Sequence, residues 1–165
     1  MKKEKYTIPA QYDHLVLVRD FIERTGHKYK FSNKVIHAVK LAVEEAITNI
    51  IRHGYKNLPP GKIVIKVYIR RFSLTIVLVD QGRSFDPRQV AAPDLAHYVS
   101  IGKIGGLGIM MIRKLMDDID YITCGGKNEF RMTKYRESFS HSRLFHWWQR
   151  VKSYSNDFID HIYPI

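Results

Sequence analysis

Two polar side chains, Glu45 and Asn49, interrupt an apolar segment of the sequence and could do chemistry together. Because they are four residues apart, they would share one face of a helix. Mg²⁺ prefers hard oxygen ligands and usually completes its shell with water and substrate phosphates, so the Asn49 amide oxygen could hold the ion beside a triphosphate. Glu45 could then accept a proton from an attacking hydroxyl group or water. The alternative is a pair of solvated polar residues on an amphipathic helix.

A second motif, Asp80-Gln81-Gly82, follows an apolar segment that is typical of a central strand. A carboxylate at the end of a strand can accept a hydrogen bond from an exocyclic amine such as that of adenine. Gly82 has no side chain and would let a planar base approach the main chain. On its own, an Asp-x-Gly sequence after a strand is also typical of an ordinary turn.

The third motif is a glycine-rich stretch, Gly105-Gly106-Leu107-Gly108, directly before a predicted helix. Free main-chain N–H groups and the positive end of the helix dipole favour phosphate at such a position. The stretch is not a P-loop, because Ile104 follows Gly102-Lys103 where a serine or threonine would be needed. A flexible joint between a loop and a helix is the alternative.

The apolar patterns around the motifs predict the elements that must position them. Alternating or continuous apolar residues indicate strands over 5–9, 62–71, 74–80, 121–124 and 130–135. Apolar residues at helical spacing indicate helices over 12–25, 33–53 and 106–118. Gly26 would end the first helix, and the Ser32 hydroxyl would cap the second. Residues 81–105 mix glycine and proline with weak periodicity, which predicts a long loop that acts as a lid.

This order of elements predicts an α+β two-layer sandwich, with helices on one face of a mixed, mostly antiparallel sheet. A doubly wound parallel sheet would need a helix between most strands, and this order does not provide one. We expect one domain over 1–137 and an aromatic-rich C-terminal extension over 138–165, which holds both tryptophans. The extension could be an amphipathic helix that covers an apolar surface, a contact with a partner, or the start of a linker.

Composition and charge narrow the class of protein. The 165 residues include 27 Lys and Arg but only 16 Asp and Glu, which gives a formal net charge of +11. This excess favours anionic partners such as nucleic acid, nucleotides, an acidic protein or a membrane surface, although it can also serve only solubility. Cys124 is the single cysteine, which excludes an internal disulfide and indicates a reducing cytoplasm. No apolar run approaches the roughly 18 residues of a membrane span.

Taken together, the order and spacing of the three motifs resemble the GHKL ATP-binding fold, also called the Bergerat fold, of gyrase, histidine kinases and MutL. The N box, G1 box and G2 box of that superfamily are matched by Glu45…Asn49, Asp80-x-Gly82 and Gly105-Gly106-Leu107-Gly108. The segments VEEAITNIIRHGY, VDQGRSFDP and IGGLGIMMIRKLMDDIDY look like the anti-sigma-factor serine kinase branch, of the RsbW and SpoIIAB type. The resemblance covers about residues 5–136.

The resemblance implies a role for each matched residue. Glu45 would be the catalytic base, and Asn49 would hold Mg²⁺ between the phosphates. Asp80 would recognise adenine, and residues 85–104 would form the ATP lid. The residues implied in cofactor binding are Asn49, His53, Asp80, Gly82, Phe85, Lys103, Gly105, Gly106, Leu107, Gly108 and Ile109.

The implied function is that of a cytoplasmic bacterial switch protein that uses ATP and Mg²⁺ to phosphorylate a serine of a STAS-domain anti-anti-sigma partner. When free, it would sequester a sigma factor or another regulator, and the family implies a homodimer. Two features depart from the family: Lys127-Asn128 stand where Gly-Thr is usual, and the charge is positive where these kinases are often acidic. The alternatives are an ATP-binding regulatory module without phosphoryl transfer and a nucleic-acid binder that acts through charge alone.

Overall fold

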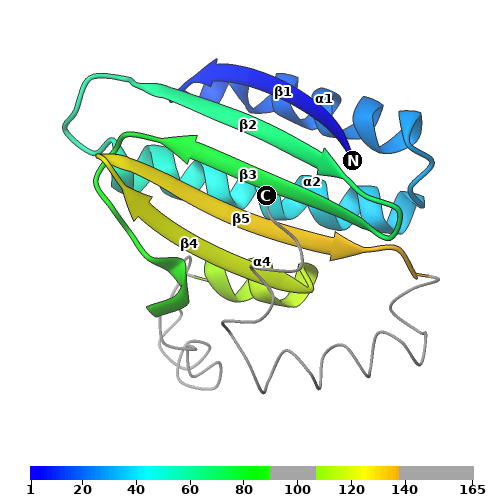
Figure 1. The fold of residues 1–165 in the computed structure, drawn as a ribbon. Helices are drawn as coiled ribbons and strands as arrows, with labels where there is room; N and C mark the ends of the chain where they lie inside the picture. The colour runs from blue at the N-terminus through cyan, green and yellow to red at the C-terminus, as the bar shows by residue number, and fades with distance from the viewer. Residues whose placement is uncertain (90–106, 138–165) are drawn as a thin grey trace, which may run out of the picture.

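The computed structural model describes residues 1–89 and 107–137, which form a sheet with three α-helices packed on one of its faces (Figure 1). In chain order the elements are β1 (Lys2–Pro9), a 3-10 turn (Tyr12–His14), α1 (Leu15–Lys28), α2 (Asn33–Asn49), a π-helical turn (Ile50–Gly54), β2 (Lys62–Ile69), β3 (Ser73–Asp80), a 3-10 turn (Pro87–Gln89), α4 (Gly108–Leu115), β4 (Asp118–Cys124) and β5 (Lys127–Tyr135).

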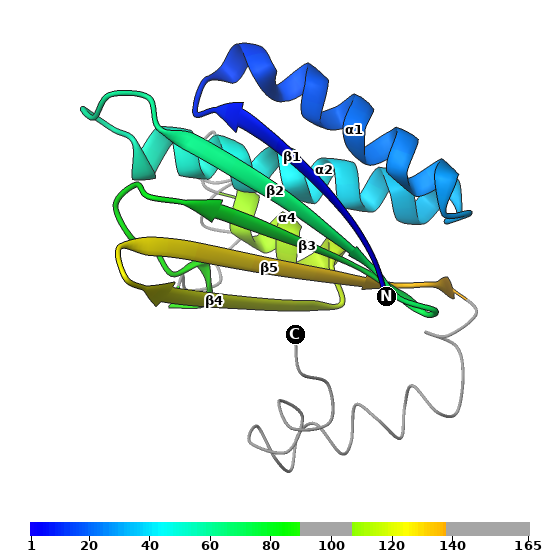
Figure 2. The same cartoon turned by 45° about the horizontal axis from the view of Figure 1, so that its top comes forward.

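The sheet has five strands in the order β1-β2-β3-β5-β4. Every neighbouring pair is antiparallel, so the predicted α+β two-layer sandwich is confirmed, and the described strands contain no parallel pair. Figure 2 shows the helices together on one side of the sheet, with α2 running beneath its centre. In the register of β3 and β5, Asp80 lies directly opposite Asn128. The topology therefore brings the end of one central strand beside the start of the other.

The core lies between the sheet and the helices because both layers have one apolar face. In β2 the buried residues alternate as Ile63, Ile65, Val67 and Ile69, which is the period of a strand with one buried face. The helix α2 buries seven residues, namely Val35, Ile36, Val39, Ala42, Val43, Ala46 and Ile47. The Ser32 hydroxyl accepts a hydrogen bond from the Val35 N–H at 3.3 Å, so the predicted cap of this helix is confirmed.

Gly26 does not end the first helix, and this part of the prediction was wrong. The helix α1 continues to Lys28, and Gly26 is buried inside it. A Cβ atom at this position would lie 2.5 Å from Ile36 Cγ1 of α2. Gly26 is therefore needed because it lets α1 approach α2 closely, not because it breaks the helix.

The last helix and the last two strands also differ from the predicted boundaries. The helix α4 ends at Leu115, and Asp118 already belongs to β4. The strand β5 begins at Lys127, because Lys127 pairs with Cys124 across a turn of only two residues. Gly125 and Gly126 make this tight turn with positive φ values of 57° and 73°.

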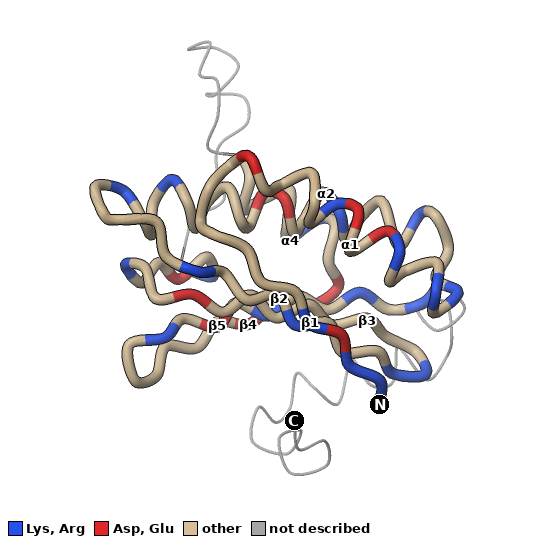
Figure 3. Tube along the Cα trace, turned by 90° about the horizontal axis from the view of Figure 1, so that it is seen from above, with Lys and Arg blue, Asp and Glu red and all other residues tan. Residues whose placement is uncertain are grey.

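Basic residues of the described chain lie on both layers and at both ends of the molecule (Figure 3). The net charge of +11 therefore does not single out one groove in this part of the chain. None of the described helices is long and apolar enough to cross a bilayer.

We predict that Ile112→Ala lowers the free energy of unfolding by about 2–5 kcal/mol, because Ile112 is fully buried where α4 packs against α2. Chemical denaturation measures this change. Val16→Ala on α1 is the control, because Val16 is 51% exposed and its truncation should change the free energy by less than about 0.5 kcal/mol. Equal effects of the two substitutions would contradict this packing of α4.

Candidate functional site

The helix α2 carries Glu45 and Asn49 on the face that points toward α4, and both side chains are half-buried. After Asn49 the helix widens into a π-helical turn that ends at Gly54. π-Helical turns are rare in proteins as a whole, and those that occur often lie at functional sites. Among the described residues, no acceptor lies within hydrogen-bond distance of the buried Asn49 Nδ2. The amide of Asn49 is therefore not committed to another described side chain.

Glu45 lies against the first residue of α4. A Cβ atom at Gly108 would collide with the Glu45 carboxylate, so the absence of a side chain at Gly108 creates the space that this carboxylate occupies. The neighbouring Glu44 has a different surrounding, because its Oε2 lies 3.5 Å from Arg19 Nε of α1. Of the two adjacent glutamates, Glu45 is thus the one placed at the N-terminus of α4, where the helix dipole favours negative charge.

Asp80 ends β3 as a buried carboxylate that is only 5% exposed. Its Oδ1 accepts a hydrogen bond from the Gly82 N–H at 2.7 Å. Burial raises the pKa of the Asp80 carboxyl above its ordinary value, and the hydrogen bonds from Asn128 and Gly82 act in the opposite direction. An acceptor of this kind suits a ligand that presents an N–H group to it.

The loop after Asp80 is held against the end of α2 by main-chain contacts. The Arg83 N–H donates to the Gly54 carbonyl oxygen at 2.9 Å. A Cβ atom at Gly82 would lie 2.8 Å from the carbonyl carbon and oxygen of Gly54. Gly82 was expected to make room for a base, and the structure adds a second reason for glycine, which is the close approach of two main chains. The Tyr55 hydroxyl accepts the Gln81 N–H at 3.1 Å and supports the same loop.

From the sequence, Asn128 was noted only as a departure from the family pattern and was not assigned to the site. It lies inside β5, whereas the sequence predicted a last strand that begins at residue 130, and it is 3% exposed. Its Nδ2 donates to Asp80 Oδ1 at 3.1 Å and to the Gly82 carbonyl oxygen at 3.0 Å. The available signal was its place beside the glycine turn, which puts it opposite Asp80 once the strands pair.

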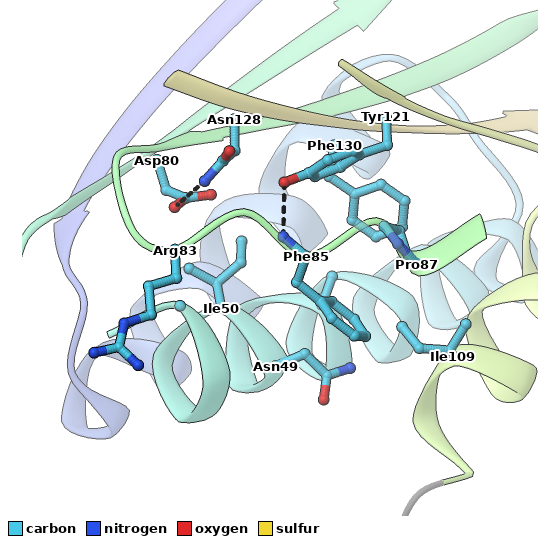
Figure 4. Close-up of a pocket in the computed structure, with 12 residues that line it drawn as sticks. Asn49, Ile50, Asp80, Arg83, Phe85, Pro87, Ile109, Tyr121, Asn128 and Phe130 are labelled. Atoms are coloured by element: carbon cyan, nitrogen blue, oxygen red, sulfur yellow. Dashed lines mark hydrogen bonds between the residues drawn. The ribbon is translucent and has the colours of Figure 1, made fainter. Parts of the chain in front are cut away.

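Asn49, Asp80 and Asn128 border one pocket, which lies between α2, β3, β5 and α4 (Figure 4). It is lined by Ala46, Asn49, Ile50, Gly54, Asp80, Arg83, Phe85, Pro87, Ile109, Tyr121, Asn128 and Phe130. The Phe85 ring stacks on His53 with ring centres 5.8 Å apart, and the Phe85 N–H donates to the Tyr121 hydroxyl at 3.0 Å. The pocket thus combines an apolar lining with a few polar groups, which is typical of sites for small molecules.

The three motifs therefore come together as far as the structure describes them. Asn49 and Asp80 line the same pocket, and Gly108 contacts Glu45 next to it. Leu107 precedes α4 as its N-terminal cap residue, and Ile109 is buried in the pocket wall. Lys103, Gly105 and Gly106 lie outside the described residues, as does most of the predicted lid.

The chain that leads into residues 90–106 is attached to α4 and β4. Arg113 Nη2 donates to the carbonyl oxygens of Pro87 and Arg88, each at 2.9 Å. The Arg88 guanidinium in turn contacts Asp120 Oδ1 at 2.7 Å and Asp86. The side chain of Arg113 thus holds the first residues of the segment predicted to be the lid.

The residues present fit a nucleotide with Mg²⁺. Gly108 opens a helix without a side chain. The unpartnered atom of Asn49 within the described chain is Nδ2, which cannot ligate a metal ion, so the ligand to Mg²⁺ would be Asn49 Oδ1. No group of three or more His, Cys, Asp or Glu side chains within residues 1–89 and 107–137 is arranged to hold a metal ion. A Mg²⁺ ion at Asn49 would therefore take most of its ligands from phosphate and water, as Mg²⁺ commonly does.

Comparisons with known proteins give matches over most of the chain. A family model described as a histidine kinase-like ATPase domain matches residues 8–134. A serine-protein kinase RsbW of Listeria monocytogenes is 32% identical over 132 residues, which cover 78% of this chain and 83% of that protein. A serine-protein kinase RsbW of Bacillus thuringiensis is 33% identical over 138 residues, which cover 81% of this chain and 85% of that protein.

Among solved structures, the RsbU and RsbW domains of Rv1364c from Mycobacterium tuberculosis match with a TM-score of 0.59. The match has 15% sequence identity and covers 81% of this chain and 32% of that one, so it supports the fold alone. The family match and the two relatives confirm the resemblance seen in the motifs. The chain belongs to the histidine kinase-like ATPase domain family, within the GHKL superfamily and its RsbW-like branch.

Proposed function

We propose that this protein is an ATP- and Mg²⁺-dependent serine protein kinase and anti-sigma factor that acts on a STAS-domain anti-anti-sigma partner. The observation that carries the proposal is that Asn49 and Asp80 line one pocket, beside which Glu45 lies against the start of α4. The names of the RsbW relatives support the reaction type. The alternative is an ATP-binding regulatory module that binds a protein partner without phosphoryl transfer.

In this proposal the nucleotide spans the pocket from β3 to α4. The Asp80 carboxylate accepts a hydrogen bond from the exocyclic amine of adenine, and Phe85 and His53 lie beside the base. The phosphates lie at the N-terminus of α4, where the main chain of Leu107, Gly108 and Ile109 faces them. Lys103, Gly105 and Gly106, which precede this helix in the sequence, are assigned the same phosphate-binding role.

The chemistry follows from the position of Glu45. Its carboxylate takes the proton of the partner's serine hydroxyl while the serine oxygen forms a bond to the γ-phosphorus. The bond between the γ-phosphorus and the bridging oxygen of ADP breaks, and ADP leaves with that electron pair. Mg²⁺ held by Asn49 would neutralise charge on the phosphates. The rest of the catalytic effect comes from positioning, because α2 and α4 hold Glu45 and the phosphate site side by side.

The proposed role also concerns partners and chain organisation. When it is not acting as a kinase, the protein would bind a sigma factor or another regulator, and we propose a homodimer in the cytoplasm. We assign the ATP-binding unit to residues 1–137. The aromatic-rich extension over 138–165 lies outside the described residues and is proposed as a separate appendage.

We predict that Glu45→Gln lowers the rate of phosphoryl transfer to a STAS partner by about 100-fold or more, because the variant cannot accept the serine proton. Transfer is measured with radiolabelled ATP, and ATP affinity should stay within about threefold of wild type. Glu44→Gln is the matched control, because Glu44 faces Arg19 and not α4. ATP binding without transfer to any STAS protein by the wild type would instead favour the regulatory module.

Asn49→Ala should weaken Mg²⁺-dependent ATP binding by about tenfold or more, because the proposed protein ligand of the ion is lost. Calorimetric titration with an ATP analogue, with Mg²⁺ and with EDTA, measures this effect. The affinity without Mg²⁺ should change little. An equal loss in both conditions would contradict the assignment of Asn49 to the ion.

Gly82→Ala should weaken ATP binding by about tenfold or more and lower the free energy of unfolding by about 1–3 kcal/mol. The reason is that a Cβ atom would lie 2.8 Å from the Gly54 main chain and would push the loop away from α2. Gln81→Ala is the control, because the hydrogen bond from residue 81 to Tyr55 uses the main chain. A Gly82→Ala variant with wild-type affinity and stability would show that this contact does not matter.

A further inference from the structure

The side chain of Asn128 is fully engaged in hydrogen bonds inside the protein. Its two N–H groups donate to Asp80 Oδ1 at 3.1 Å and to the Gly82 carbonyl oxygen at 3.0 Å. Its Oδ1 accepts from the Ser84 hydroxyl at 2.9 Å and from the Thr123 hydroxyl at 3.4 Å. Every polar atom of this buried amide thus has a partner, which is the arrangement that makes a buried polar group rigid.

The partners also determine which way the amide points. Asp80 and Gly82 offer only oxygen atoms toward Asn128, so the NH₂ group must face them. A flipped amide would place its oxygen against the Asp80 carboxylate and against the Gly82 carbonyl oxygen. It would also place the NH₂ group near the two hydroxyl groups. The observed orientation therefore follows from the chemistry of the neighbours.

This amide holds one oxygen of Asp80 and leaves the other available. Asp80 Oδ1 receives two hydrogen bonds, from Asn128 Nδ2 and from the Gly82 N–H. Within the described chain no donor lies on Asp80 Oδ2, and Asp80 lines the pocket. Figure 4 shows Asp80 and Asn128 facing each other at the edge of the pocket. The carboxylate cannot rotate freely, because rotation would break both bonds to Oδ1.

We propose that Asn128 is a positioning residue for base specificity. It holds Asp80 Oδ1 so that Oδ2 accepts a hydrogen bond from the exocyclic amine of a purine. This inference rests on the proposed nucleotide site and adds a residue that stands where the family usually carries threonine. A base with a carbonyl group at that position, such as hypoxanthine, would place one acceptor against another and bind less well.

The other charged and titratable groups near Asp80 do not hold its Oδ1 in place. Tyr55 uses its hydroxyl to accept the Gln81 N–H, and Tyr121 on β4 uses its hydroxyl to accept the Phe85 N–H. Arg83 lines the pocket but contacts the end of α2 through its main chain. Burial raises the pKa of Asp80, and the hydrogen bond from Asn128 lowers it. Removing that bond should therefore raise the pKa further.

The test compares the affinities of ATP and inosine triphosphate, which carries a carbonyl oxygen in place of the amine, across about pH 5–9. Wild type should prefer ATP by about tenfold or more. Asn128→Leu should weaken ATP binding by about tenfold while the affinity for inosine triphosphate changes by less than about threefold. When the solution is acidified, the ATP affinity of this variant should begin to fall at a higher pH than that of wild type. The reason is that the pKa of Asp80 is higher in the variant, and Asp80 must be ionised to accept the hydrogen bond.

Asn128→Asp is a second variant of nearly the same shape. At low pH its protonated carboxyl can donate to Asp80 as the amide does, so ATP should bind. As pH rises this proton is lost, two carboxylates face each other, and ATP binding should weaken. The two variants thus change the pH dependence in opposite directions, which a purely structural role would not produce. Glu129→Gln, the next residue of β5 with its side chain on the opposite face, is the control.

Each outcome distinguishes the proposed role of Asn128 from the proposed nucleotide site. If Asn128→Leu keeps the wild-type preference for ATP and the wild-type pH dependence, the role of Asn128 is wrong and the nucleotide site stands. If wild type binds neither nucleotide, the proposed function fails and the specificity proposal fails with it. If Asn128→Leu does not fold, as judged by its thermal unfolding, the pH dependence of Asn128→Asp decides: ATP binding that strengthens with rising pH would overturn the proposal.

Discussion

The site depends on the close approach of two main chains, that of Gly82 after β3 and that of Gly54 at the end of α2. No side chain fits between them, since a Cβ atom on Gly82 would lie 2.8 Å from Gly54. The Arg83 N–H completes the contact with a hydrogen bond to Gly54. This contact places the helix that carries Glu45 and Asn49 next to the strand that ends in Asp80. Without it, the polar groups would not border one pocket.

A second constraint acts within the helical layer. The helix α4 packs on α2, and its first residue, Gly108, leaves room for the Glu45 carboxylate. A negative charge is favourable at the start of a helix, so Glu45 is stabilised where the phosphates of a nucleotide would bind. Binding of phosphate there would place like charges close together.

Much of the fold, and two of the polar residues that line the pocket, could be predicted from the sequence. The alternation in β2, the Ser32 cap and the three motifs in order led to the fold and to Asn49 and Asp80, because local spacing determines which residues share a face. Gly26 was misjudged because its role depends on contact with Ile36 in another helix. Asn128 was noted only as a departure from the family and was not assigned to the site, for a similar reason. Its importance arises from the register of β3 against β5, and a single sequence does not specify which distant strands pair.

The central claim is that one pocket holds the base at β3 and the phosphates at α4. A crystal structure with a non-hydrolysable ATP analogue and Mg²⁺ tests it most directly. We predict density for the base amine within hydrogen-bond distance of Asp80 Oδ2, with the phosphates at the main chain of Gly108 and the ion beside Asn49. An analogue bound elsewhere, or bound with its phosphates at Asp80, would contradict the account.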